Sequence, residues 1–257
     1  MFNQHYDQMM REAVEAYPNE AVWFITEAGC WQAENTSTDP ENRFSVKDSD
    51  TLRAMDEGML AIVHSHPHHP PCPSEADMRG QIASGVPWGV IGVQDKIATP
   101  PYWWGDGVPV PDLRDRTFHH GITDCYSLIR DYYRVEMGIL LPEYPRSWNW
   151  WSKNEEQSEP KNLYLEGFAS AGFVPIAMGV DPDNFLGLEH EPEPGDMWFT
   201  QLFSPVPNHG GVYLGNGLCM HHLSSRHPVD PSRPVREEPI YRWASHVTHW
   251  FRHKERM

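Results

Sequence analysis

Apolar and polar positions follow two different periods along the first hundred residues. The segment 5–16 carries apolar side chains at helical spacing and is followed by Pro18, which predicts a helix that ends there. Short apolar runs bounded by turn residues predict buried strands. The expected strands cover 21–26, 43–46, 60–64 and 88–93, and two further expected helices cover 48–58 and 75–84. Helices and strands that alternate in this way indicate an α/β domain, which we place at residues 1–95.

The pattern changes in the second half of the chain. Residues 96–112 are rich in proline and glycine, cannot sustain a helix, and predict a semi-rigid linker. The remaining residues, 113–257, form a second expected domain. In it, a strand that starts at His209 and turns at Asn216-Gly217 has a strong β-hairpin pattern. A final strand is expected within 241–254.

Composition limits the kinds of partner. The 257 residues include 20 Lys and Arg against 36 Asp and Glu, a formal charge of −16, which argues against sequence-independent nucleic-acid binding. The start lacks a basic and apolar leader and no apolar run approaches about 18 residues, so we expect no secretory signal, no membrane span and synthesis in the cytoplasm. The four scattered cysteines favour neither a disulfide framework nor a cysteine zinc site.

Two histidines at the end of an apolar strand form the first candidate site. On an extended backbone, residues two apart point to the same face, so His64 and His66 present their imidazoles together. Ser74 fits the N-cap of the next helix, and Asp77, one turn on, can direct its carboxylate back to the imidazoles. Two histidines and one aspartate leave a fourth position open, which is the layout of a catalytic zinc.

The spacing His-x-His, seven residues, Ser-x-x-Asp resembles the JAMM motif of MPN-type metalloproteases, and every position of the motif is filled. The resemblance implies Zn²⁺ held by His64, His66 and Asp77, with Ser74 helping to hold the oxyanion. The general acid/base of that family would be Glu20, at the start of an expected strand. A carboxylate beside zinc-bound water can take its proton, because the metal lowers the pKa of that water to about 7.

A packing role remains open for these histidines, because histidines at strand ends usually lie on the surface or pack against neighbours. The loop that follows is itself histidine-rich, with His68, His69 and Cys72. We interpret these three as loop residues, although any of them could approach the metal.

A second candidate site lies at a helix start. Asp124 or Thr123 caps a predicted helix that Gly138 ends. Cys125 is then in the first turn, where unpaired backbone N–H groups and the helix dipole favour a thiolate. A cysteine there can also be an ordinary packed thiol, so catalysis requires a base.

Two histidines at the ends of the predicted hairpin can supply that base. His209 begins the hairpin and His221 ends the return strand, so their imidazoles lie near the same end. One of them can deprotonate Cys125 while the other orients it. The alternative for each is an exposed residue at a strand end.

These segments resemble the NlpC-type cysteine peptidases, which have an Asp-Cys at a helix start, a His-x-Gly-Val-Tyr-Leu-Gly strand and a third polar residue. The resemblance implies a papain-like domain in which the helix-borne cysteine packs on a small antiparallel barrel or sheet, so the fold class of the chain is α/β (α+β). Cys125 would be the nucleophile, His209 the base and His221 the orienting residue. Two departures are that the family's Asp-Cys-Ser-Gly reads Asp124-Cys125-Tyr126-Ser127, and that His222 follows His221 as an alternative third residue.

A JAMM domain followed by an NlpC-type domain resembles the K-type tail-tip assembly family of lambda-like siphophages. The resemblance implies a hydrolase at the distal tail tip of a virion, with other tail-tip and hub proteins and bacterial peptidoglycan as partners. The cysteine domain would cleave murein stem peptides as a D,L-endopeptidase, and the zinc domain would process a tail protein during assembly. Two alternatives remain open: a structural tail-tip plug with little turnover, and a JAMM isopeptidase that acts on ubiquitin-like modifiers.

Overall fold

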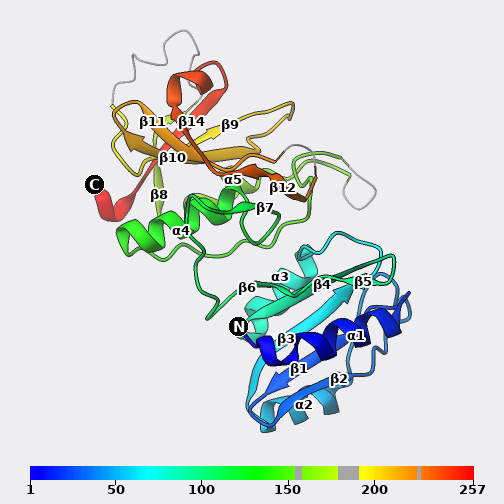
Figure 1. The fold of residues 1–257 in the computed structure, drawn as a ribbon. Helices are drawn as coiled ribbons and strands as arrows, with labels where there is room; N and C mark the ends of the chain where they lie inside the picture. The colour runs from blue at the N-terminus through cyan, green and yellow to red at the C-terminus, as the bar shows by residue number, and fades with distance from the viewer. Residues whose placement is uncertain (154–157, 179–190, 225–226) are drawn as a thin grey trace. The chain divides into compact units, whose positions relative to one another are not determined.

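The computed structural model describes residues 1–153, 158–178, 191–224 and 227–257. The chain divides into two compact units, Met1–Pro109 and Val110–Met257 (Figure 1). Each unit has its own sheet and is described by itself. Among the described residues, no helix combines the length and the apolar character that crossing a bilayer requires.

The first unit is built on a mixed sheet with the strand order β2-β1-β3-β4-β5, to which β6 adds beside β4. Its strands are β1 (Val22–Thr26), β2 (Gly29–Ala33), β3 (Met59–His66), β4 (Trp88–Gln94), β5 (Ile97–Ala98) and β6 (Tyr102–Trp104). Its helices are α1 (Tyr6–Ala16), α2 (Asp48–Asp56) and α3 (Glu75–Ser84), with a short 3-10 turn at Asn3–His5 before α1. The central strand β3 runs antiparallel to β1 and parallel to β4.

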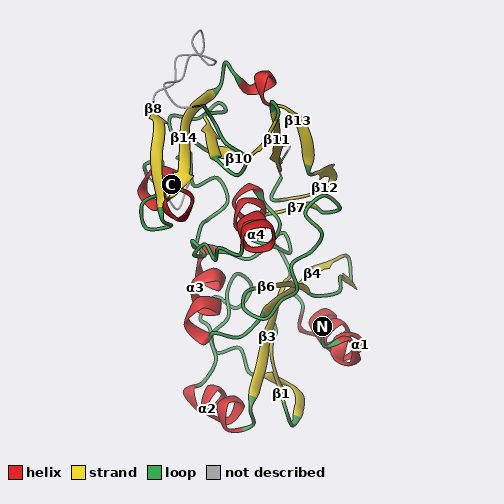
Figure 2. Ribbon diagram, turned by 90° about the vertical axis from the view of Figure 1, so that its left-hand side faces the viewer, coloured by secondary structure: helices red, strands yellow, loops and turns green. Residues whose placement is uncertain are grey.

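Side-chain alternation along β3 separates the core of this unit from its candidate site. Met9 and Ala13 of α1 pack in one cluster with Ala61 and Val63. Because successive side chains of a strand point to opposite faces, Ile62, His64 and His66 belong to the other face. Figure 2 shows α1 on one side of β1 and β3, and α2 and α3 on the other side.

Two parts of the first unit differ from the sequence-based expectation. The segment 43–46 was expected as a strand but is irregular, and the Asn35 side chain holds its backbone: Asn35 Nδ2 donates to the Arg43 carbonyl (3.1 Å), and Asn35 Oδ1 accepts from the Ser45 N–H (3.1 Å). Within the expected linker 96–112, β5 and β6 both hydrogen-bond to β4, so the first sheet extends to residue 104.

The second unit contains a six-stranded antiparallel sheet with the order β13-β11-β10-β9-β14-β8 and a separate two-stranded pair, β12-β7. The strands are β7 (Thr117–His119), β8 (Phe173–Met178), β9 (Met197–Thr200), β10 (His209–Gly215), β11 (Leu218–His221), β12 (Val229–Pro234), β13 (Arg236–Pro239) and β14 (Val247–His253). The helices are α4 (Cys125–Met137) and α5 (Leu163–Gly167), and short 3-10 helices cover Ile240–Trp243 and Lys254–Arg256. A mixed α/β chain with a helix-borne cysteine on an antiparallel sheet confirms the expected fold class.

Helix α4 packs against β10, and Ile129 and Tyr133 of the helix share a cluster with Val212 of that strand. Strand β10 lies between β9 and β11, where the close approach of the chains requires glycine. A Cβ on Gly211 would lie 2.4 Å from the Met220 carbonyl oxygen, which real Cβ atoms do not tolerate. The sequence His209-Gly210-Gly211 thus allows the tight packing that fixes the histidine at the strand's start.

Candidate metal centre and cysteine site

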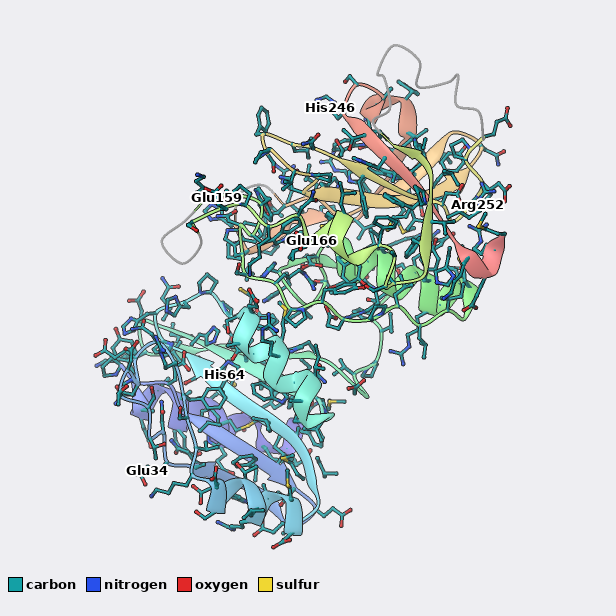
Figure 3. All side chains as sticks on the ribbon, turned by 180° about the vertical axis from the view of Figure 1, so that it is seen from behind. Glu34, His64, Glu159, Glu166, His246 and Arg252 are labelled. Atoms are coloured by element: carbon teal, nitrogen blue, oxygen red, sulfur yellow. The ribbon has the colours of Figure 1, made fainter. Side chains whose placement is uncertain are left out.

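Three buried side chains of the first unit bring ligand atoms together. The ligand atoms of His64, His66 and Asp77 all lie within 4.8 Å of one another. The two Nε2 atoms are 3.0 Å apart, and the Asp77 carboxylate oxygens lie 3.5 Å from His64 Nε2 and 3.7 Å from His66 Nε2. His64, which is labelled in Figure 3, belongs to β3.

Local structure aims each of these groups. The His66 Nδ1–H faces the Pro70 carbonyl oxygen at 3.0 Å, which leaves Nε2 with its lone pair directed at the cluster. Ser74 and Asp77 form a capping box at the start of α3: the Asp77 N–H donates to Ser74 Oγ, and the Ser74 N–H donates to Asp77 Oδ2. The cap therefore holds the Asp77 carboxylate while it closes the helix.

Glu20 reaches this cluster because of the register between β1 and β3. Val22 pairs with His64 in an antiparallel ladder, so Glu20 falls opposite His66. Ser65 holds this end of the ladder in two ways: its backbone N–H donates to the Ala21 carbonyl oxygen (2.9 Å), and its hydroxyl oxygen accepts the Ala21 N–H (2.9 Å). Glu20 Oε1 lies 3.9 Å from His66 Nε2. Burial, with the nearby Asp77 charge, raises the pKa of Glu20 to about 7 although His66 opposes the shift.

The donor set fits a divalent metal ion. Bonds of about 2.0–2.1 Å at tetrahedral angles place ligand atoms about 3.3 Å apart, which lies within the range of separations between these three groups. Burial lowers the pKa of His64, which favours the neutral imidazole with one ring nitrogen available to a metal. Burial also acts to lower the pKa of His66, but Asp77 and Glu20 outweigh it and raise that pKa. Burial would raise the pKa of Asp77, but the two histidines hold it well below its ordinary value, so the carboxylate is charged.

The other loop residues turn elsewhere. His68 faces Glu41 (3.7 Å) and His69 faces Asn42 Oδ1 (3.1 Å), so both tie the loop to the segment near residue 40. Neither they nor Cys72 belong to the ligand group found among the described residues.

In the second unit, Cys125 begins α4. Asp124 is the N-cap, and its carboxylate accepts the Ser127 N–H (2.9 Å) and the Gly121 N–H (2.8 Å). The buried guanidinium of Arg146 forms a bidentate pair with the same carboxylate, with Nε donating to Oδ2 (3.0 Å) and Nη2 to Oδ1 (3.0 Å). Burial raises the pKa of Asp124, but Arg146 outweighs it and keeps the pKa below the ordinary value. The turn that carries the cysteine is therefore held rigidly.

The Cys125 thiol opens into a cavity of about 670 Å³ that His209, Tyr164 and Arg146 also line. Its hydrogen-bond partner is the Tyr164 hydroxyl, with Sγ and Oη 3.0 Å apart. Burial and the Asp124 charge raise the pKa of the thiol to about 11, although Tyr164 opposes the shift. Burial and the Asp124 charge thus oppose the thiolate that the helix start was expected to favour, and a base is needed to remove the proton.

His209 belongs to a line of polar groups across three adjacent strands. His209 Nε2 lies 3.1 Å from His221 Nδ1, and His221 Nε2 lies 2.8 Å from Glu238 Oε1. On the sheet these residues are diagonal neighbours, since His221 pairs directly with Gly211 and with Arg236. Burial, together with His221 and His222, lowers the pKa of His209 well below its ordinary value.

His222, the alternative third residue, takes a different place. Its Nε2 lies 2.9 Å from the Arg233 carbonyl oxygen, and its ring lies edge-on to Phe118. It lines the cavity, but the residue that hydrogen-bonds to His209 is His221.

Three residues that contact the site were missed from the sequence: Tyr164, Arg146 and Glu238. Each contacts the site from a segment far along the chain, so spacing within one motif could not identify it. From the sequence alone, an arginine between a proline and a serine, and a glutamate in a short run of charged residues, are expected to lie at the surface. Only the tertiary fold brings Tyr164 to the cysteine, Arg146 to its N-cap and Glu238 to the histidines.

The matches to known families follow the two units. Residues 2–104 match the model of prokaryotic homologs of the JAB domain, and residues 99–249 match the NlpC/P60 family. Because the second match spans more than half of the chain, the protein belongs to the NlpC/P60 family, with a JAB-like domain preceding the cysteine domain.

Two relatives share both units. Tail tip assembly protein K of Escherichia phage lambda is 33% identical over 208 residues, which is 80% of this chain and 87% of the relative. Tail tip assembly protein K of Escherichia phage N15 is 28% identical over 233 residues, covering 84% of this chain and 83% of the relative. The chain is thus a homologue of tail tip assembly protein K, as the motif order predicts. The chain also matches a crystal structure of an NlpC/P60 family protein from Bacillus cereus with 12% identity and a TM-score of 0.27. The match covers 98% of this chain and 67% of the Bacillus cereus chain.

Proposed function

We propose that the second unit is a cysteine endopeptidase that cleaves murein stem peptides, with Cys125 as nucleophile, His209 as base and His221 as the residue that orients the base. The observation that carries the proposal is the hydrogen bond between His209 and His221 beside the cavity that His209 shares with the thiol. The substrate class rests on the family and on the tail proteins to which the chain is homologous. Its scissile bond would join γ-D-glutamate to diaminopimelate.

The chemistry requires a base because the thiol is neutral near pH 7. Sγ forms a bond to the amide carbonyl carbon while the thiol proton passes to His209. The carbonyl oxygen takes up the negative charge, which the backbone N–H of Cys125 at the start of α4 can stabilise. The protonated His209 then gives its proton to the leaving amine, and water hydrolyses the thioester to release the acid.

The first unit is proposed to be a zinc metallopeptidase. His64, His66 and Asp77 would hold the Zn²⁺, which when bound supplies a Lewis acid and an activated water. Glu20 Oε1 lies 3.9 Å from His66 Nε2, so its carboxylate would be placed to take and return a proton of that water. Ser74, whose hydroxyl donates to the Asp77 carboxylate (2.7 Å), would help to hold the oxyanion.

We place the protein at the distal tail tip of a phage virion, made in the host cytoplasm. The names of its two relatives support this location. Its partners would be other tail-tip and hub proteins and the bacterial peptidoglycan, and the zinc site would process a tail protein during assembly.

A defined peptide tests the cysteine half. Wild-type protein and Cys125→Ser are incubated with the tripeptide L-Ala-γ-D-Glu-diaminopimelate, and the products are identified by mass. Wild type should release diaminopimelate, whereas Cys125→Ser should be inactive. If wild type leaves both this peptide and intact murein uncut, the endopeptidase proposal fails and a structural tail-tip plug becomes the better account.

Metal content tests the other half. Purified wild-type protein should contain about one zinc per chain, and His66→Ala should contain far less, because a ligand is removed. A matched control is His68→Ala, since His68 faces Glu41. Equal zinc in wild type and His66→Ala would contradict the assignment.

A further inference from the structure

Glu238 ends the polar line that starts at His209. It lies on β13, and its Oε1 accepts from the Trp243 indole N–H (3.0 Å) and lies 2.8 Å from His221 Nε2. Its second oxygen accepts from Arg242 Nη1 (3.0 Å). Two groups that can only donate, an indole and a guanidinium, thus converge on one carboxylate, which is the environment of an ionised acid.

The surroundings of the two histidines leave them few other partners. The His221 ring lies 4.8 Å from Trp243 and 5.9 Å from Trp198, and the His209 ring lies 5.5 Å and 5.8 Å from the same two indoles. Aromatic walls offer the imidazole nitrogens little hydrogen bonding in the ring planes. Hydrogen bonds along the line therefore decide which nitrogen of each ring carries the proton.

The carboxylate sets the direction of every hydrogen bond in the line. An ionised Glu238 can only accept, so His221 carries its proton on Nε2. The Nδ1 of a neutral His221 then has a free lone pair and accepts from His209 Nε2–H. A neutral His209 with its proton on Nε2 has its free lone pair on Nδ1.

Resting on the function proposed above, we infer that Glu238 is a positioning residue for the cysteine peptidase: through His221 it fixes the tautomer in which His209 Nδ1 is the base that takes the Cys125 proton. When that proton arrives, His209 carries one proton on each nitrogen and one positive charge. His221 stays neutral and accepts from His209 Nε2–H, and the Glu238 carboxylate stabilises the charge without taking a proton. The sequence motif ends at the histidine pair, so the acid extends the site by one residue on a third strand.

Two substitutions separate charge from hydrogen bonding. Glu238→Gln keeps the shape and an oxygen that can accept from His221 Nε2–H but removes the charge, whereas Glu238→Ala removes both. Glu237→Gln is the control, because it removes the same charge from the neighbouring position, where the carboxylate pairs with Arg114 at the surface (2.6 Å). All are made in the full chain, with His209→Ala and Cys125→Ala as references.

The first readout needs no peptide substrate. Iodoacetamide alkylation of the Cys125-containing peptide is followed by mass spectrometry as a function of pH. We expect the rate near pH 7 to fall in the order wild type, Glu238→Gln, Glu238→Ala, with a loss on the order of 10-fold or more in the last and none in Glu237→Gln. In peptide hydrolysis the loss should appear in kcat with KM unchanged, because Glu238 does not line the cavity.

The possible outcomes separate a failure of the role inferred for Glu238 from a failure of the proposed peptidase function. If His209→Ala lowers alkylation while Glu238→Gln and Glu238→Ala match wild type, the role of Glu238 is overturned and the cysteine–histidine pair stands. If the alkylation rate of His209→Ala also equals that of wild type, His209 does not act as the base for Cys125, and the proposed function is overturned as well. The near-isosteric Glu238→Gln variant keeps the test valid should Glu238→Ala unfold.

Discussion

Tyr164 has the most direct contact with the proposed nucleophile. Its hydroxyl lies 3.0 Å from Cys125 Sγ, and its ring packs in a tilted contact with Phe199 (centroids 4.3 Å apart) and edge-on to Trp150 (5.4 Å). The packed ring fixes the hydroxyl in place. Because a phenol donates well to a thiolate and burial raises the thiol pKa, Tyr164 partly offsets the cost of ionising Cys125.

Replacing Tyr164 with Phe should therefore slow alkylation of Cys125 near neutral pH. A hydrogen bond to a charged group contributes about 1.5–3 kcal/mol, so the rate should fall at least about 10-fold. Tyr144→Phe is the matched control, since its hydroxyl lines the same cavity but bonds to the Gly167 carbonyl (2.9 Å) and to Ser170. Equal alkylation rates in the two variants would refute this role.

The buried base predicts the pH dependence of hydrolysis. His209 must be neutral to accept the thiol proton, and its pKa lies well below the ordinary 6.5 because of burial and of the neighbouring His221 and His222. The neutral form thus persists as the pH falls through 6.5, and kcat/KM should decline only at more acidic pH. A pH–rate profile that is already half-maximal at 6.5 or above would show that His209 is not the base, or that it is exposed.

At the scale of elements, local patterns predicted the parts that one segment determines. Apolar runs and capping residues predicted β3, α3, α4 and the hairpin β10–β11, and they placed His64, His66 and Cys125 at element ends. The place of Glu238 in the site could not be predicted from local patterns, because it depends on the register between β11 and β13. The same limit explains β6, whose three residues among prolines form a strand only because β4 pairs with them.

The capping box of α3 links helix stability to metal binding. Ser74→Ala removes the acceptor for the Asp77 N–H and one donor to its carboxylate. The helix should lose about 1 kcal/mol, and zinc affinity should fall about 10–100-fold as Asp77 becomes less well held. Calorimetry and zinc titration measure the two effects, with the exposed Ser49→Ala in α2 as control. An unchanged zinc affinity in Ser74→Ala would show that the helix cap does not contribute to metal binding.

At the scale of the whole molecule, the two candidate sites belong to different compact units. The proposed metal ligands lie in Met1–Pro109, and the candidate cysteine site with Cys125 and His209 lies in Val110–Met257. The two family matches divide the chain in nearly the same way. One chain therefore combines a JAB-like domain with an NlpC/P60 domain, and a single substitution in one unit should disable its proposed site without changing the other.

Metal binding should stabilise one unit alone. A ligand at a hundredfold excess over its Kd adds about 2.7 kcal/mol to the state that binds it. Zinc added after chelation should raise the unfolding temperature of the first unit and leave the second unit's transition in place, as seen in a calorimetric scan with unit-specific limited proteolysis. His66→Ala should abolish the shift. A shift that persists in this variant would mean that zinc binds elsewhere.

The most direct test of the account is a muropeptide analysis of purified murein digested by wild type, Cys125→Ala and His66→Ala. We predict that wild type and His66→Ala cut the stem peptides at the same bond and that Cys125→Ala does not. Loss of cutting in His66→Ala, or its persistence in Cys125→Ala, would contradict the assignment of murein hydrolysis to the cysteine unit.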